Sequence, residues 1–369
     1  MSLHSKFLLE DLYNQVENQT EASFSTACMP AFSLEEFLDF TQTPLDKLLN
    51  TSLDYSTSFG DLELRTAIKE ELYPSLNADQ IFITNGSAEA IYLLFQTLFK
   101  AGDTIIVQKP IYQSLYQVAE DNGVEIIDFD LSLDREKWDL NELEKLIKTK
   151  PEIKALVINN PNNPTGYTFS TEELKQISSI LGNRPLIADE IFQNTCLYET
   201  SSIIDIHKNS IVISGLSKAY CVPGLRIGWL AVHDPKALEQ CSSLKNYLSI
   251  RNSTLSERLA IPAIKNSKKI KEKNLLEIQA NLSFIQNKNP DELFFELPKT
   301  TVQSLTIMPK IKNSILEKYG GADKFSQYLL EKYKILLVTG SVYSERYKDY
   351  CRIGLGKKLS FLDNDKISF

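Results

Sequence analysis

Short apolar runs alternate with segments of helical hydrophobic spacing between about residues 60 and 235. The apolar runs, many of them ended by proline, glycine or a polar turn, predict strands over residues 80–84, 104–108, 124–131, 154–159, 185–190, 210–215 and 224–232. The helical spacing predicts helices over residues 62–72, 88–99, 111–121 and 171–181. Short apolar strands separated by helices are typical of a parallel sheet covered on both faces. We therefore expect an α/β domain rich in βαβ units.

Past about residue 235 the pattern changes to longer helical stretches and fewer strands. We expect a long helical stretch over residues 235–279 and a further helix over 317–333. Two strands are expected over residues 302–308 and 334–339. This change predicts a large domain of residues 46–244 and a smaller α+β domain. The smaller domain would combine the N-terminal segment 1–45 with residues 245–369.

Polar motifs follow four of the predicted strands, at the point where each strand ends. They are NGS at residues 85–87, NNPNNPTG at 159–166, DE at 189–190 and SGLSK at 214–218. In open α/β sheets, ligands bind outside the carboxyl ends of the strands. The coincidence of four polar motifs at these ends predicts one shared ligand site.

Composition narrows the classes of function. The net charge is −8 and no long basic run occurs, which argues against nucleic acid as the main partner, since phosphate backbones need a basic face. The 5 cysteines lack CxxC spacing and the 3 histidines do not cluster, so we expect neither a disulfide framework nor a metal site. This cysteine usage indicates a reducing compartment, the cytoplasm. No apolar run is long enough to span a membrane, and the N-terminus lacks the basic start of a signal peptide.

Lys218 lies in the string SGLSKAYCVPGLRIGW, just after a predicted strand. This string resembles the S-x-S-K and G-x-R-x-G motifs of the class I/II aminotransferases, which are pyridoxal phosphate (PLP) enzymes of fold type I. Gly224 and Arg226 keep the register, and NNPNNPTG and Asp189 precede Lys218 in the family's order. The resemblance runs over roughly residues 50–356. It implies a mainly parallel seven-stranded sheet in a three-layer α/β/α large domain, with a smaller α+β domain.

The resemblance also assigns cofactor contacts. Lys218 would bind PLP as a Schiff base and carry the substrate's α-proton, as a lysine can when burial and nearby cations make it less basic. Asp189 would pair with the pyridine nitrogen and keep it protonated, and Tyr112 would stack on the ring. Asn163 would donate a hydrogen bond to ring oxygen O3′. The phosphate would be bound by Gly86, Ser87, Ala88, Ser217 and Arg226. A helix N-terminus and an arginine fork both suit a phosphate.

Two further assignments concern the substrate and the neighbouring subunit. Arg352, in YCRIGLG, would hold the substrate α-carboxylate through its two-pronged guanidinium, with Asn163 and Tyr112 beside it. Tyr55, in YSTSFGDLELR, would reach the phosphate bound by a neighbouring subunit, so the resemblance implies a homodimer. Tyr343 either lines the pocket or is a core aromatic.

Two positions depart from the family pattern. Phe192 stands where the family usually has a tyrosine that donates to O3′, which leaves Asn163 as the main side-chain donor. Gly215 stands where a serine or threonine often touches the phosphate. Ser214 and Ser217 are the residues that could compensate.

The function that the resemblance implies is transfer of the amino group of an L-amino acid to a 2-oxo acid, by a ping-pong mechanism. Relatives of this fold also catalyse β- or γ-elimination, decarboxylation, cyclisation or oxidation, and the two departures leave these alternatives open. A transcription regulator with such a domain would need a basic DNA-binding module, and the segment before Tyr55 is not basic. The sequence does not identify the amino acid. No second substrate-binding arginine can be assigned, so a dicarboxylate substrate is not supported.

Overall fold

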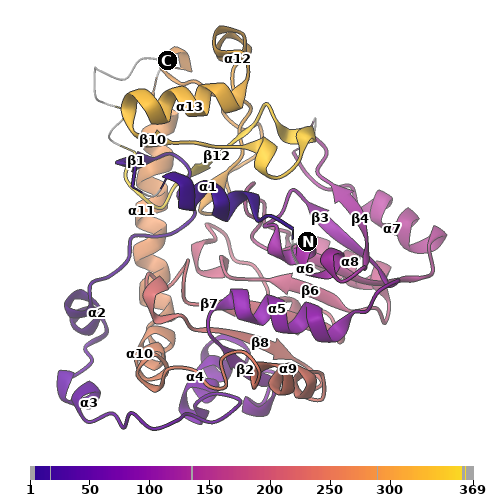
Figure 1. Cartoon of the computed structure of the whole chain (residues 1–369), viewed down its shortest axis with the longest axis vertical. Helices are drawn as coiled ribbons and strands as arrows, with labels where there is room; N and C mark the ends of the chain where they lie inside the picture. Colours follow the sequence, from indigo (N-terminus) through magenta and orange to yellow (C-terminus); the bar gives the residue numbers. More distant parts are fainter. Residues whose placement is uncertain (1–4, 17, 134–135, 289, 360–361, 363–369) are drawn as a thin grey trace.

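The computed structural model describes residues 5–16, 18–133, 136–288, 290–359 and 362. A seven-stranded sheet occupies one part of the molecule, and two small sheets with the long helix α11 (Ser267–Asn287) occupy the other (Figure 1). None of the helices in these ranges combines the length and apolar character needed to span a bilayer.

The large sheet confirms the mainly parallel, seven-stranded arrangement. Its strands run in the order β2 (Ile81–Thr84), β8 (Gly228–Val232), β7 (Ser210–Gly215), β6 (Leu186–Asp189), β5 (Ile153–Asn159), β3 (Thr104–Lys109) and β4 (Glu125–Asp130). β8 runs in the opposite direction to the other six strands of this sheet. The register puts Asn159 opposite Asp189, so the polar ends of β5 and β6 lie side by side.

Helices cover both faces of this sheet, which is why its inner strands are apolar throughout. Successive residues of one strand enter different cores: Ile81 and Ile83 pack in one buried cluster and Phe82 in the other. The first cluster includes residues of α4 (Leu62–Leu72), α7 (Leu140–Thr149) and α8 (Thr171–Leu181). The second includes residues of α5 (Ser87–Leu98), α6 (Ser114–Asp121) and α9 (Ala237–Lys245). The result is the three-layer α/β/α arrangement that the sequence predicts.

The C-terminal part contains a three-stranded sheet, β11 (Val338–Thr339), β12 (Cys351–Gly354) and β9 (Thr306–Ile307), all antiparallel. The N-terminal segment joins this part because β1 (Ala22–Ser23) pairs in parallel with β10 (Ile335–Leu336). The remaining helices are α1 (Leu8–Val16), α2 (Leu34–Thr41), α3 (Leu45–Leu49), α10 (Thr254–Lys265), α12 (Asn313–Tyr319) and α13 (Ala322–Tyr333).

Several element boundaries differ from the sequence prediction. The helix expected over 317–333 is broken into α12 and α13, because Gly320 ends α12 with a left-handed φ of 76°. The stretch expected over 235–279 is divided among α9, α10 and α11. The strand expected over 224–232 begins only at Gly228, since Arg226 adopts a left-handed φ of 54°. Helix α7 is not among the helices expected from the sequence.

Candidate active site

Most of the predicted site residues meet at one cavity of about 570 Å³, at the carboxyl ends of β5 and β6. This volume lies within the range of ordinary small-molecule sites. The predicted residues that line it are Ser87, Ala88, Tyr112, Asn163, Asp189, Ser217, Lys218, Arg226 and Arg352. Gly86 lies at its edge as the N-cap of α5. Tyr55 does not line the cavity, and its side chain is 80% exposed.

One end of the cavity is built to accept an anion. Helix α5 begins at Ser87, and its first backbone N–H groups have no partner within the helix. Gly86 has a φ of 80°, and a methyl group on it would lie 2.3 Å from Nη2 of Arg226. The Arg226 guanidinium therefore lies against this helix end, and its Nη1 donates to Ser217 Oγ at 3.2 Å. Free N–H groups beside an arginine fit the phosphate of PLP.

Gly215 departs from the family because backbone fills the space beside it. A methyl group on Gly215 would meet the carbonyl oxygen of Ile227 at 3.0 Å and Cα of Gly228 at 3.2 Å. Ser214 does not compensate, since it faces a different pocket, beside Tyr73. Ser217 lines the cavity and contacts Arg226, so of these two serines Ser217 is the one at the anion end, where Ser87 also lies.

Asp189 is a buried carboxylate that lines the same cavity. Its Oδ1 accepts a hydrogen bond from the backbone N–H of Ile191 at 3.0 Å. Burial raises the pKa of Asp189 to about 7, against the Ile191 hydrogen bond and the charge of Lys218, which both lower it. A buried carboxylate without a cation in contact is suited to a protonated ring nitrogen. The donor set therefore fits PLP at both ends, phosphate and pyridine nitrogen.

Asn159 supports this carboxylate and was not among the predicted site residues. Its Nδ2 donates to the Asp189 carbonyl at 2.8 Å, and its Oδ1 accepts from the Asn163 N–H at 2.6 Å. Asn159 thus ties the end of β6 to the NNPNNPTG loop. The signal was present in the sequence, since Asn159 opens that loop at the end of a predicted strand.

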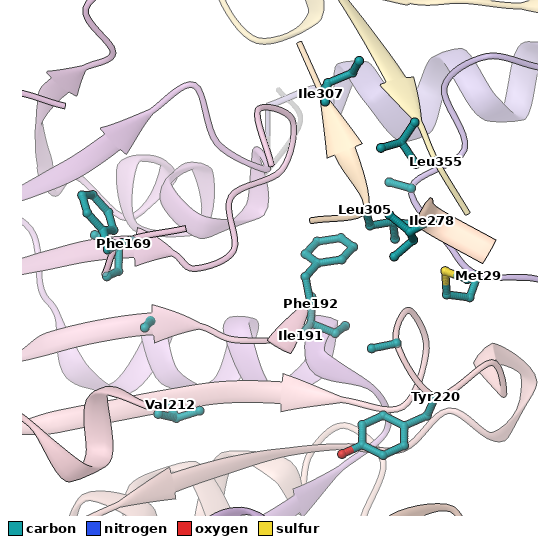
Figure 2. Packing of buried hydrophobic residues seen from close by; sticks show 14 of the residues in the cluster. Met29, Phe169, Ile191, Phe192, Val212, Tyr220, Ile278, Leu305, Ile307 and Leu355 are labelled. Atoms are coloured by element: carbon teal, nitrogen blue, oxygen red, sulfur yellow. The ribbon is translucent and has the colours of Figure 1, made fainter. Parts of the chain in front are cut away.

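Phe192 lines the cavity but belongs to the apolar core. It is 4% exposed and packs in the buried cluster that also holds Met29, Ile278 and Leu305 (Figure 2). Its ring carries no donor, and the NNPNNPTG loop lines the cavity with two amide side chains, Asn159 and Asn163.

Arg352 is 1% exposed and all its bonds are to neutral groups. Its Nη1 donates to Asn163 Oδ1 and to the Tyr343 hydroxyl, each at 3.0 Å. Its Nε and Nη2 donate to the Ser25 carbonyl at 3.0 and 2.7 Å, and Nη2 also donates to the Tyr13 hydroxyl. Tyr343 is therefore a buried partner of the arginine. A buried arginine with no carboxylate in contact is suited to bind one from a ligand.

Lys218 lines the same cavity, and its charge acts on Asp189. It is half-buried, and its Nζ donates to Cys28 Sγ at 3.2 Å. Cys28 comes from the N-terminal segment and lines the same cavity. This contact could not be predicted from the sequence, because 190 residues separate the two side chains.

Helix α1 lines one side of the cavity, and its residues were not among the predicted site residues. Glu10 and Tyr13, three residues apart on one face of α1, line the cavity together with Phe7, which directly precedes the helix. The Tyr112 hydroxyl donates to Glu10 Oε1 at 2.8 Å, and the rings of Phe7 and Tyr112 lie 5.1 Å apart. Burial, with the charge of Glu10, raises the pKa of Tyr112 above its usual range, so this phenol remains a neutral donor.

The comparisons with known proteins agree with this geometry. A probable aspartate aminotransferase of Methanocaldococcus jannaschii is 27% identical over 320 residues, or 82% of this chain and 81% of that protein. A PLP-dependent aminotransferase from Streptococcus suis superposes with a TM-score of 0.89 at 25% identity, covering 98% of this chain and 96% of that one. The PLP-dependent cyclase OrfR shares the fold, with a TM-score of 0.87 at 24% identity over 97% of this chain and 95% of its own.

The family model described as aminotransferase class I and II matches residues 41–360. The match extends through the seven-stranded sheet and on to β12, so it includes both Lys218 and Arg352. It therefore describes most of the chain rather than one motif, and the chain belongs to the class I and II aminotransferase family.

Proposed function

We propose that this protein is a PLP-dependent aminotransferase that moves the amino group of an L-amino acid to a 2-oxo acid, with Lys218 as the catalytic residue. The observation that carries the proposal is the convergence of Lys218, Asp189, Arg226 and Arg352 on one cavity. These side chains match, in order, the aldehyde, the ring nitrogen and the phosphate of PLP, and the carboxylate of an amino acid.

When bound, PLP supplies an electron sink for the carbon that loses its proton. Asp189 holds the proton on the ring nitrogen, since a buried carboxylate is stabilised by a cation in contact. Arg226, Ser217 and the N-terminus of α5 bind the phosphate. Lys218 Nζ, the amine that would hold PLP, would also be the group that accepts and returns the α-proton.

Arg352 and its neighbours orient the amino acid. A substrate carboxylate would replace the Tyr13 and Asn163 partners of the guanidinium, because a charge-assisted bidentate bond is stronger than one to a neutral oxygen. Asn163, released in this way, can turn toward the ring oxygen. The stacking face of the ring would lie against Tyr112, whose hydroxyl is anchored by Glu10.

A second subunit would complete the site. Tyr55 is 80% exposed, and other large apolar side chains before it and after α9 are exposed as well, Leu49, Leu53, Tyr247, Leu248 and Ile250. Thr254 donates to the Asp54 carbonyl at 2.6 Å, so the start of α10 lies against the residue before Tyr55. Exposed apolar side chains of this kind support a homodimer in which Tyr55 reaches the partner's phosphate. All 5 cysteines are free, which supports a cytoplasmic location.

An absorbance experiment tests the proposed reaction. The holoenzyme is mixed with each L-amino acid, and the PLP band is followed together with ammonia release. Transfer predicts loss of the band, pyridoxamine phosphate as the stable product, and recovery of the band on addition of a 2-oxo acid. Ammonia release without pyridoxamine phosphate would instead indicate a lyase, and conversion without either product a cyclase or decarboxylase.

A further inference from the structure

Glu10 is the charged group of the cavity that the proposed function leaves unused. Four other acidic or basic side chains line it, and the proposed function assigns each a partner: Asp189, Lys218, Arg226 and Arg352. Glu10 is half-buried, and among the described residues no lysine, arginine or histidine forms an ion pair with it. A carboxylate that is partly removed from water without a counter-ion is costly, unless a ligand supplies the cation.

The position of Glu10 is fixed from two sides. Its Oε1 accepts the Tyr112 hydroxyl at 2.8 Å, and no described residue bonds Oε2. The preceding residues of the segment are fastened to the large sheet's helices, since the Leu8 N–H donates to Gln113 Oε1 at 2.9 Å and Gln113 Nε2 donates to the Lys6 carbonyl at 2.7 Å. Glu10 therefore presents one unused carboxylate oxygen at a fixed place in the cavity wall.

The charge balance of the cavity then determines which side chain it favours. The substrate's α-carboxylate would pair with Arg352, and PLP would take up Arg226 through its phosphate, Asp189 through its ring nitrogen and Lys218 through its aldehyde. None of these groups is then assigned to Glu10. A second carboxylate on the substrate would be repelled by it, whereas an ammonium or guanidinium would form a charge-assisted hydrogen bond.

We infer that Glu10 is a specificity-determining residue and that the amino donor is an L-amino acid with a cationic side chain. The inference rests on the proposed function for the placement of the α-amino and α-carboxylate groups. A hydrogen bond between charged groups predicts a preference of roughly 10- to 150-fold for a cationic side chain over a neutral one of the same shape.

The test compares amino acids of matched shape and different charge on the holoenzyme. The rate of loss of the PLP band gives kcat/KM for L-ornithine against L-norleucine, for L-arginine against L-citrulline, and for L-glutamate. The first two ratios separate an ammonium from a guanidinium preference. Calorimetric titration with the 2-methyl derivatives of the same amino acids gives binding without turnover, because these derivatives lack the α-proton.

The expected result is a cationic-to-neutral ratio of roughly 10 to 150 in rate and in binding. Glu10→Gln should reduce that ratio toward one, and Glu10→Lys should shift the preference to L-glutamate. Asp11→Asn, which removes the same charge from the same helix at a residue that does not line the cavity, should leave the ratio unchanged.

Equal binding of cationic and neutral amino acids by the wild type, or a ratio unaffected by Glu10→Gln, would overturn the inference. The two readouts also separate it from the proposed function. Conversion of amino acids without any charge preference removes the inference and retains aminotransfer. A charge preference in binding without pyridoxamine phosphate retains the inference and removes aminotransfer.

Discussion

Asn163 Oδ1 accepts a hydrogen bond from Arg352 Nη1 at 3.0 Å, although 189 residues separate the two. Asn163 belongs to the loop that follows β5, and Arg352 lies in β12 of the small three-stranded sheet. Both side chains are buried. The contact therefore joins the group assigned to the cofactor ring with the group assigned to the substrate carboxylate.

Replacing Arg352 tests the substrate end of this contact. Arg352→Lys keeps the charge but cannot form two parallel hydrogen bonds to a carboxylate. We therefore expect kcat/KM for the amino acid to fall about 100-fold or more, which is a loss of roughly 3 kcal/mol of transition-state stabilisation. PLP affinity should change far less, because Arg352 does not touch the phosphate end. Arg346→Lys, at a side chain that is 49% exposed, is the control and should retain activity. A parallel loss of PLP binding would argue against a substrate role for Arg352.

The pH dependence of apoprotein stability tests Asp189. Burial raises its pKa to about 7 in the folded state. The folded protein then holds a proton that the unfolded chain releases, so this stabilisation is present at low pH and is lost as pH rises through 7. Asp189→Asn should therefore stabilise the apoprotein more at pH 8 than at pH 5.5, by about 2 kcal/mol in urea unfolding. An equal effect at both values of pH would show that the buried carboxylate is not protonated.

Two glycines of one motif test the anion end. A methyl group on Gly228 would lie 2.4 Å from backbone atoms of Gly86 and Ser87, whereas one on Gly224 would meet nothing within 4 Å. Gly228→Ala should thus push β8 away from the start of α5, weaken PLP binding and cost about 1–3 kcal/mol of stability. Gly224→Ala should leave both unchanged. Fluorescence titration with PLP and urea unfolding measure the two effects, and similar behaviour of the two variants would refute the close approach.

Mixing two inactive variants tests whether Tyr55 acts across a dimer interface. Tyr55→Ala subunits retain Lys218, and Lys218→Ala subunits retain Tyr55. Random exchange of subunits should restore one native site in each hybrid, giving about a quarter of wild-type activity in an equal mixture. Activity no greater than the sum of the separate variants would place Tyr55 outside the partner's site.

The sequence predicted the elements of the large sheet because each strand is a short apolar run between polar turns. It also predicted most of the cavity, since Lys218, Asp189 and the NNPNNPTG loop follow those runs directly. The predicted ends of strands and helices were wrong where a left-handed backbone conformation interrupts the hydrophobic pattern, as at Arg226 before β8 and at Gly320 after α12.

The contacts that could not be predicted join segments far apart in the chain. Lys218 and Cys28 are 190 residues apart, and Arg352 and Tyr13 are 339 apart. Both partners come from the N-terminal segment, whose amphipathic pattern indicates a helix but not the surface on which it packs. Glu10 is the same case: its position in the cavity depends on α1 meeting Tyr112.

Borohydride reduction of the holoenzyme tests the assignment of Lys218 most directly. Reduction fixes PLP to the lysine that holds it, and peptide mass spectrometry then identifies that residue. We expect the phosphopyridoxyl group on Lys218, and none on any lysine of a Lys218→Ala variant. A label on Lys109 or Lys245, which are the buried lysines among the residues that the structure describes, would contradict the account.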